Sequence, residues 1–226
     1  CRICLKSGDD VIQAQAISNL VYALGKMGCN RYALTDRVIM ALEIAIRKSA
    51  RLLTLMNDDT IQIMRGLSLM MFKWTPEDTS LTEETRTLLS NALYSSQVSV
   101  SKRSGYFGLI RLSTLLDILA NLGVVWSSME GQMKATILLG LSSASEDPSV
   151  VRNYNQVEDA AVVARGLAGT LYGLQRLAVP YIELPESVKQ SLVKAITIFA
   201  SVAPSIESTK STNEIDSSVV TGLSGA

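Results

Sequence analysis

The chain has 226 residues, 47% of them hydrophobic, and its 21 basic residues balance 21 acidic ones. This composition can bury a core, whereas the zero net charge argues against tight RNA binding by this segment alone, because phosphate neutralisation needs a basic excess. There is no histidine, which excludes His-dependent general bases, Ser-His-Asp and Cys-His nucleophile systems, and His-containing metal sites. The apolar run closest to a membrane span, residues 109–126, is interrupted by Arg111, Asp117 and Asn121, so no span is predicted.

Cysteines do not predict a metal or redox centre. Cys1 and Cys4 form a CxxC pair, but no second pair completes a four-thiolate zinc site, and the third cysteine is Cys29. A redox CxxC would open a helix after a strand, and no such context surrounds this one. We therefore interpret the cysteines as incidental thiols of a reducing compartment, and we expect neither a metal nor another cofactor.

The first predicted element is an amphipathic helix over residues 12–28. Its apolar residues recur at spacings of three and four, which places them on one helix face. These residues are Ala16, Leu20, Ala23, Leu24 and Met27. Gly28 follows the end of this helix and Gly123 the end of a later one, where a left-handed residue is often needed.

The end of this first helix recurs along the chain. Residues 22–28 align well with residues 172–178, less well with 117–123 and least well with 67–73. Each copy is followed by a second apolar and periodic segment, and these segments cover residues 35–55, 81–98, 129–144 and 186–202. We therefore predict an all-α fold, an α-solenoid of about four two-helix repeats that stack to make one continuous core.

Two further segments stand out by composition. Gly166, Ala168, Gly169 and Gly173 lie within the fourth first helix, and we expect close approach to another helix there, because a phosphate cradle would need a preceding strand and a Gly-Lys-Ser/Thr ending. Residues 203–226 are rich in Ser, Thr and Gly and lack an amphipathic period. The predicted organisation is a helical-repeat domain over residues 1–202 and an irregular C-terminal tail over residues 203–226.

The first helix also resembles a known family. Residues 15–28, read Gln-Ala-Ile-Ser-Asn-Leu-Val-Tyr-Ala-Leu-Gly-Lys-Met-Gly, resemble the first helix of the octotricopeptide repeat, which is also found in RAP-domain and FAST-kinase-like organellar proteins. The resemblance implies an α-solenoid of mitochondria or plastids that binds RNA, acts in transcript maturation or serves in a ribosome. The repeats here exceed the family's usual length, and no regular set of base-reading positions recurs, so only the fold and the broad role are carried over.

We expect a non-enzymatic protein, and the resemblance implies that it is mitochondrial, with a chloroplast or other plastid as the other compartment. It would associate with RNA as a subunit of a mitochondrial ribosome or another ribonucleoprotein complex, beside other protein subunits. The candidate RNA contacts are polar and basic residues of the first helices, namely Asn19, Lys26, Arg65, Arg111, Arg165 and Arg176. Tyr22 and Tyr172 are expected in the core, since they lie within apolar stripes at helical spacing.

Two other function classes remain open at this stage. One is a protein–protein scaffold of a large organellar assembly without direct RNA contact, which the zero net charge favours. The other is an enzyme, but adjacent acids such as Asp58 and Asp59 lie at predicted helix starts, where the helix dipole explains them, and no nucleophile with a base accompanies them. The feature that separates RNA binding from scaffolding is whether the candidate bases converge on one surface.

Overall fold

A computed structural model describes most of the chain. The described residues are 8–50, 57–75, 77–78, 80–100, 106–143, 157–197 and 200. Throughout these ranges the regular structure is helical and no strand occurs, so the all-α prediction is confirmed there. The Cys1–Cys4 pair and the predicted tail over residues 203–226 lie outside the described residues.

Within the described residues, eight α-helical segments form four consecutive pairs. The first helices of the pairs are α1 (Gly8–Lys26), α3 (Asn57–Leu69), α5 (Tyr106–Asn121) and α8 (Val157–Arg176). The second helices are α2 (Asp36–Ala50), α4 (Glu83–Val100), α6 (Gly131–Ser143) and a helix over residues 186–197. Short 3₁₀ turns, which the sequence analysis did not predict, precede three of the second helices: η1 (Arg31–Ala33), η2 (Trp126–Ser128) and η3 (Tyr181–Glu183).

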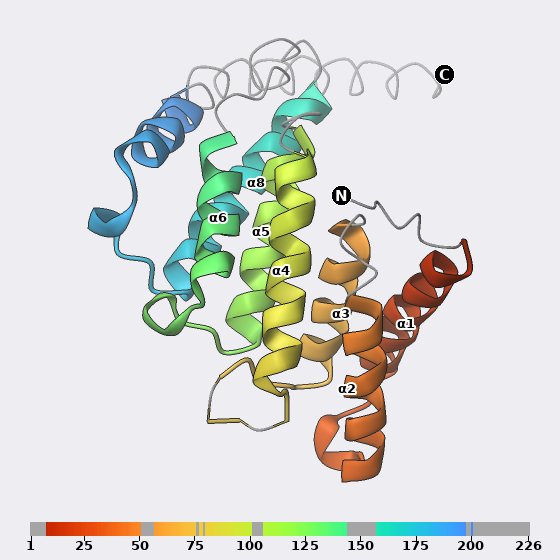
Figure 1. The fold of residues 1–226 in the computed structure, drawn as a ribbon. Coiled ribbons are helices and arrows are strands. Elements are labelled where there is room, and N and C mark those ends of the chain that lie inside the picture. Colours follow the sequence, from red (N-terminus) through yellow and green to blue (C-terminus); the bar gives the residue numbers. More distant parts are fainter. Residues whose placement is uncertain are drawn as a thin grey trace, which may run out of the picture.

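The pairs follow one another in space in the same order as in the sequence. Each first helix contacts the next one, α1 with α3, α3 with α5 and α5 with α8, and the second helices α2, α4 and α6 contact each other in turn. Figure 1 shows this progression from the red and orange helices α1 and α2 to the blue helix of the fourth pair. Ser191 of that blue helix donates to the carbonyl of Leu141 in α6, 3.1 Å away. Each pair therefore packs mainly on its neighbours along the chain.

The same helix-ending turn occurs in all four pairs. The second residue after the end of each first helix has a positive φ, and we call it the turn residue. The four turn residues are Gly28, Met71, Gly123 and Ala178. The next residue donates its N–H to a carbonyl five positions back, as in Cys29 to Leu24 at 3.0 Å, which is the Schellman arrangement. The left-handed turn predicted at Gly28 and Gly123 is confirmed. Met71 and Ala178 adopt it without being glycine.

These turns also join the pairs to one another. The residue three positions after each of the first three turn residues donates its backbone N–H to the next pair. The acceptor is the carbonyl of the residue directly before the next turn residue. These hydrogen bonds run from Arg31 to Met70 at 2.9 Å, from Trp74 to Leu122 at 2.8 Å and from Trp126 to Leu177 at 2.8 Å. The turns therefore hold successive first helices in one register. This register corrects the predicted second copy, since residues 65–71, not 67–73, correspond to residues 22–28.

Glycines allow two pairs of first helices to approach closely. A Cβ atom added to Gly66 in α3 would lie 2.5 Å from the carbonyl oxygen of Val21 in α1. In α8, a Cβ on Gly173 would lie 2.5 Å from the Cβ of Leu116, and Gly166 and Gly169 also face α5. The predicted close helix approach is confirmed for these three glycines of α8, whereas Ala168 is exposed.

Candidate functional site

The exposed side of the first helices carries most of the predicted RNA contacts. The residues six positions before the turn residues form a row along this side, which we call the outer row: Tyr22, Arg65, Asp117 and Tyr172. Tyr172 is 60% exposed, so the expectation that it lies in the core is wrong. Tyr22 is partly exposed. The apolar stripe of the sequence did not distinguish these rings from core residues, because they lie at its edge.

Side chains in and beside the outer row contact polar neighbours on the same or the adjacent helix. The Arg65 guanidinium lies 5.8 Å from the ring centre of Tyr22, and Asn19 accepts a hydrogen bond from Gln62 at 2.9 Å. At the other end, Arg176 lies 5.9 Å from the ring centre of Tyr172. These contacts place an aromatic face beside a guanidinium at both ends of the row.

The basic residues near the row are partly neutralised. Arg176 donates to the Asp117 carboxylate at 2.5 Å and to the Asn121 side-chain oxygen at 2.8 Å. Lys26 is exposed at the last turn of α1. An anion that bound at Arg176 would therefore have to compete with the Asp117 carboxylate.

The six predicted contacts do not form one cluster. Asn19 and Arg65 contact the neighbouring helix across the α1–α3 junction, whereas Lys26 lies at the end of α1 and Arg176 on α8 near the turn. Arg111 and Arg165 lie further from the turns along α5 and α8, twelve and thirteen residues before the turn residues of those helices. At about 1.5 Å of rise per residue, they stand roughly 9–10 Å along the helix axis from the outer row. Both have partners within the protein.

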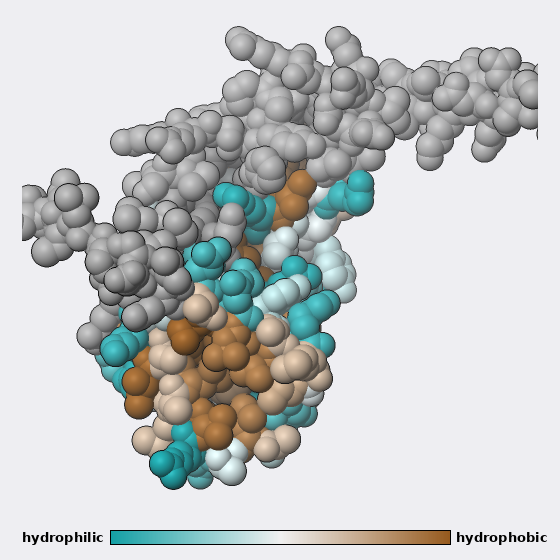
Figure 2. Space-filling view, turned by 90° about the vertical axis from the view of Figure 1, so that its right-hand side faces the viewer, coloured by the Kyte–Doolittle hydropathy of each residue, from teal (hydrophilic) through white to brown (hydrophobic). Residues whose placement is uncertain are grey.

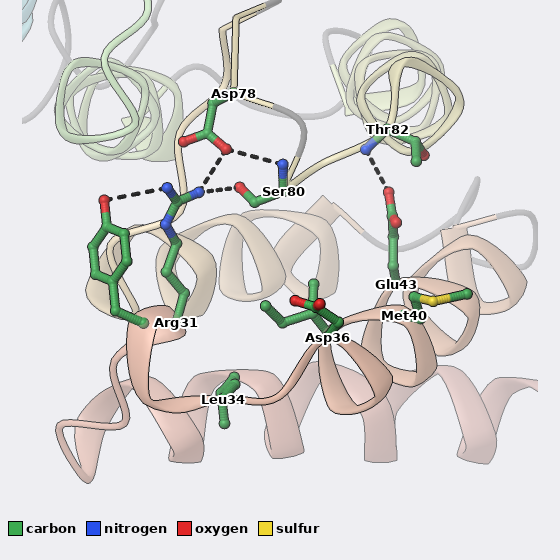
Figure 3. A pocket seen from close by; sticks show the side chains of 10 residues that line it. Arg31, Leu34, Asp36, Met40, Glu43, Asp78, Ser80 and Thr82 are labelled. Atoms are coloured by element: carbon green, nitrogen blue, oxygen red, sulfur yellow. Dashed lines mark hydrogen bonds and ion pairs between the residues drawn. The ribbon is translucent and has the colours of Figure 1, made fainter.

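A second feature is a groove between α2 and the segment before α4. It has a volume of about 550 Å³, and Figure 3 shows the side chains that line it. The lining residues are Arg31, Tyr32, Leu34, Asp36, Ile39, Met40, Glu43, Asp78, Ser80 and Thr82. None of these was predicted from the sequence as a site residue, because the two walls lie far apart in the chain.

An ion pair closes one side of this groove. Arg31 and Asp78 are 2.6 Å apart, with side chains 14% and 16% exposed, and Arg31 also donates to the Ser80 hydroxyl and to the Tyr32 hydroxyl. Burial alone would raise the pKa of Asp78, but the hydrogen bonds from Arg31 and Ser80 outweigh it and lower this pKa below its usual value. The hydrogen bond to Asp78 raises the pKa of Arg31.

A buried carboxylate forms the other side. Glu43, 8% exposed, accepts hydrogen bonds from the Thr82 N–H at 2.5 Å and the Thr85 hydroxyl at 2.7 Å. Thr82 and Thr85 lie at the start of α4, where the helix dipole favours a negative charge. The charged groups of the groove thus hydrogen-bond the first helix pair to the second. This structural role explains why these charged side chains are there, and it requires no bound ligand.

Groups that would suggest metal or membrane chemistry were also sought. Among the described residues, no three His, Cys, Asp or Glu side chains are placed to hold a metal ion. No helix in that part of the chain combines the length and apolar character needed to cross a bilayer. No family model matches the sequence, and neither a curated protein nor a solved structure matches it.

Proposed function

We propose that this protein is a non-enzymatic α-solenoid of a mitochondrion or plastid that associates with RNA inside a larger ribonucleoprotein complex. The supporting observation is the contrast between two positions in the register of the turns. Four residues before each turn residue the side chain is always leucine, at Leu24, Leu67, Leu119 and Leu174. Two positions earlier, in the outer row, the residue type varies from pair to pair: Tyr22, Arg65, Asp117 and Tyr172. A uniform core beneath a varied surface is typical of repeat proteins that contact an extended ligand one unit at a time.

The chemistry of the outer row suits unpaired nucleotides. Tyrosine rings and guanidinium planes stack on bases, and amides such as Asn19 can hydrogen-bond to base edges. Two of the four row positions are tyrosines, and each has an arginine within 6 Å of its ring centre. Because Arg176 is paired with Asp117 and the net charge is zero, stacking would contribute more to the affinity than phosphate attraction, and the salt dependence would be shallow.

The direct test measures binding of single-stranded RNA by the purified chain and by Tyr172→Ala. Loss of one base-stacking ring is expected to weaken binding by roughly 5-fold to 150-fold, from about 1–3 kcal/mol per stacked base. Tyr181→Ala is the matched control, because Tyr181 is 59% exposed but lies in η3, away from the outer row. Equal affinities for both variants would contradict the proposal.

Crosslinking in the native assembly supplies the second test. RNA crosslinks that map to Tyr22, Arg65 and Tyr172 are expected. If crosslinks instead run only to proteins, the alternative gains: a protein–protein scaffold without direct RNA contact. Two observations favour that alternative: the six candidate contacts do not form one cluster, and an apolar face lies at the α1–α2 end of the molecule (Figure 2). The organelle follows from the family resemblance, and localisation of the tagged full-length protein tests it.

A further inference from the structure

The end of the molecule formed by α1 and α2 exposes large apolar side chains. Figure 2 shows them gathered on one face, which we call the N-terminal end face. Its members on these helices or directly after α1 are Leu20, Met27 and Val38, with exposed fractions between 47% and 75%. A surface of this kind on a folded domain indicates an interaction site.

In the other pairs, the corresponding positions are buried. Met27 precedes its turn residue by one position, as do Met70, Leu122 and Leu177, which are all 0% exposed while Met27 is 75% exposed. The carbonyls of Met70, Leu122 and Leu177 accept hydrogen bonds from the backbone N–H groups of Arg31, Trp74 and Trp126, which belong to the preceding pairs. In α2, Val38 is the third helical residue, and its counterparts Thr85, Met133 and Val188 are buried. The N-terminal end face is therefore the side on which every other pair is covered by a preceding pair.

The fourth pair shows the complementary exposure. Seven positions before the turn residue, the first three pairs have the fully buried side chains Val21, Met64 and Leu116. The fourth pair has Leu171 at this position, and Leu171 is 38% exposed. Ile196 is 42% exposed, while its counterparts in the other second helices, Ile46, Leu93 and Leu141, are at most 1% exposed. Val21 and Leu116 contact the glycine of the following pair. Leu171, Val193 and Ile196 thus form a C-terminal end face that has the character of a covering surface.

We propose that the two end faces bind each other in trans, so that a second copy of this chain stacks its fourth pair on the first pair. Within the chain, Val21 packs on Gly66 and Leu116 packs on Gly173. In each case the first residue lies seven positions before its turn residue, and the glycine lies five positions before the turn residue of the following pair. In trans, Leu171 takes the first position and Ala23 the second, and Ala23 is smaller than Ile118, which holds this position where α3 meets α5. The Tyr181 N–H then donates to the Met27 carbonyl, as Trp126 does to Leu177.

This contact joins two different surfaces, so it leaves one end of each kind open and extends into a linear chain unless the rotation closes a ring. The zero net charge removes the long-range repulsion that would oppose stacking of identical molecules. The inference does not depend on RNA binding, because the outer row lies on a different side of the first helices from the two end faces.

The test is sedimentation of the full chain over a range of micromolar concentrations, with two variants. The wild-type mass is expected to rise above the 24.4 kDa of one chain to dimers and larger species. Met27→Glu and Ile196→Glu should each be monomeric alone. Mixed in equal amounts they should form dimers and nothing larger, since each variant retains the face that the other lacks.

Ile182→Glu is the control, because Ile182 is 85% exposed in η3 and its counterparts Tyr32 and Ser127 are exposed as well. It should assemble like the wild type. A wild-type chain that stays monomeric throughout overturns the proposal. So does dimerisation of either Glu variant alone, which would show that one face pairs with its own copy.

Discussion

The junction between the first and second pairs differs from the junction between the second and third. At the first, Gly66 lets α3 rest directly on the backbone of α1, and the polar contacts of Arg31 and Glu43 reach across to the loop and start of α4. At the second, Ile118 occupies the position that corresponds to Gly66, and α3 and α5 contact each other less extensively than α1 and α3 do. Ile118 is 2% exposed and fills the space between the helices.

The backbone bond between turns is the same at both junctions, Arg31 to Met70 and Trp74 to Leu122. Register and spacing are therefore set by different groups. The turn fixes which residues face each other, and the size of one side chain, five positions before the turn residue, decides how close the helices come. Three predictions test this division, and the largest effect is expected where two backbones touch.

Gly66→Ala should be the most damaging small substitution at the first junction. Its new Cβ would meet the Val21 carbonyl oxygen at 2.5 Å and the Tyr22 nitrogen at 2.8 Å, which are backbone atoms that cannot move aside alone. Overpacking of this kind costs about 3 kcal/mol of the free energy of unfolding, more than the roughly 1 kcal/mol that alanine gains in helix propensity. Urea unfolding followed by circular dichroism measures the change.

Gly173→Ala is the matched comparison, since it lies at the same register position but meets the Leu116 side chain instead of backbone. The Cβ of Leu116 moves only with its backbone, but the next atom that the new Cβ meets is 3.3 Å away, so we expect a loss of about 1–2 kcal/mol. Gly131→Ala, with open space around its Cβ, should change stability by less than about 0.5 kcal/mol. Equal losses at Gly66 and Gly131 would show that close approach does not limit the first junction.

Ile118→Val tests the second junction with a smaller change. Removing one buried methyl group is expected to cost about 1 kcal/mol, because the wider spacing of α3 and α5 leaves the space unfilled. The same urea unfolding measurement applies. A neutral result would mean that the helices close over the gap, and that Ile118 does not set their spacing.

Much of this architecture could be predicted from local sequence. Apolar residues at spacings of three and four predicted the helices, and Gly28 and Gly123 predicted the left-handed turns. The second copy was placed two residues out of register because Met71 takes the left-handed conformation that glycine adopts elsewhere. An isolated glycine such as Gly66 gave no sign that its helix closely approaches another.

The candidate site was less predictable. Helical periodicity separates buried from exposed faces, but it does not rank residues at the boundary, so Tyr172 was placed in the core although it is 60% exposed. The Arg31–Asp78 pair joins residues 47 positions apart, and no local pattern indicates such a pairing. The groove of Figure 3 could therefore be found only in three dimensions.

Asp78→Asn is predicted to cost less than the substitutions at Gly66, Gly173 and Ile118, and it tests whether the polar contacts add to the glycine contact at the first junction. The pKa of Asp78 is lowered in the folded chain, so its ionised form contributes stability above the unfolded pKa, about 3.9. That contribution is lost as the pH falls through the lower folded value. The wild type should exceed Asp78→Asn by roughly 0.5–1 kcal/mol at pH 6, a range typical of partly exposed ion pairs, and the difference should shrink as the pH falls below about 4.

Unfolding measured from pH 6 to pH 3 follows this difference. A double-mutant cycle with Arg31→Gln isolates the pair from the other hydrogen bonds of Asp78. A difference that stays constant with pH would show that the stabilisation does not come from the ionised Asp78 carboxylate, whose pKa both Arg31 and Ser80 lower. In that case the glycine contact and the turn alone would define the first junction, and the charged groove would add nothing to its spacing.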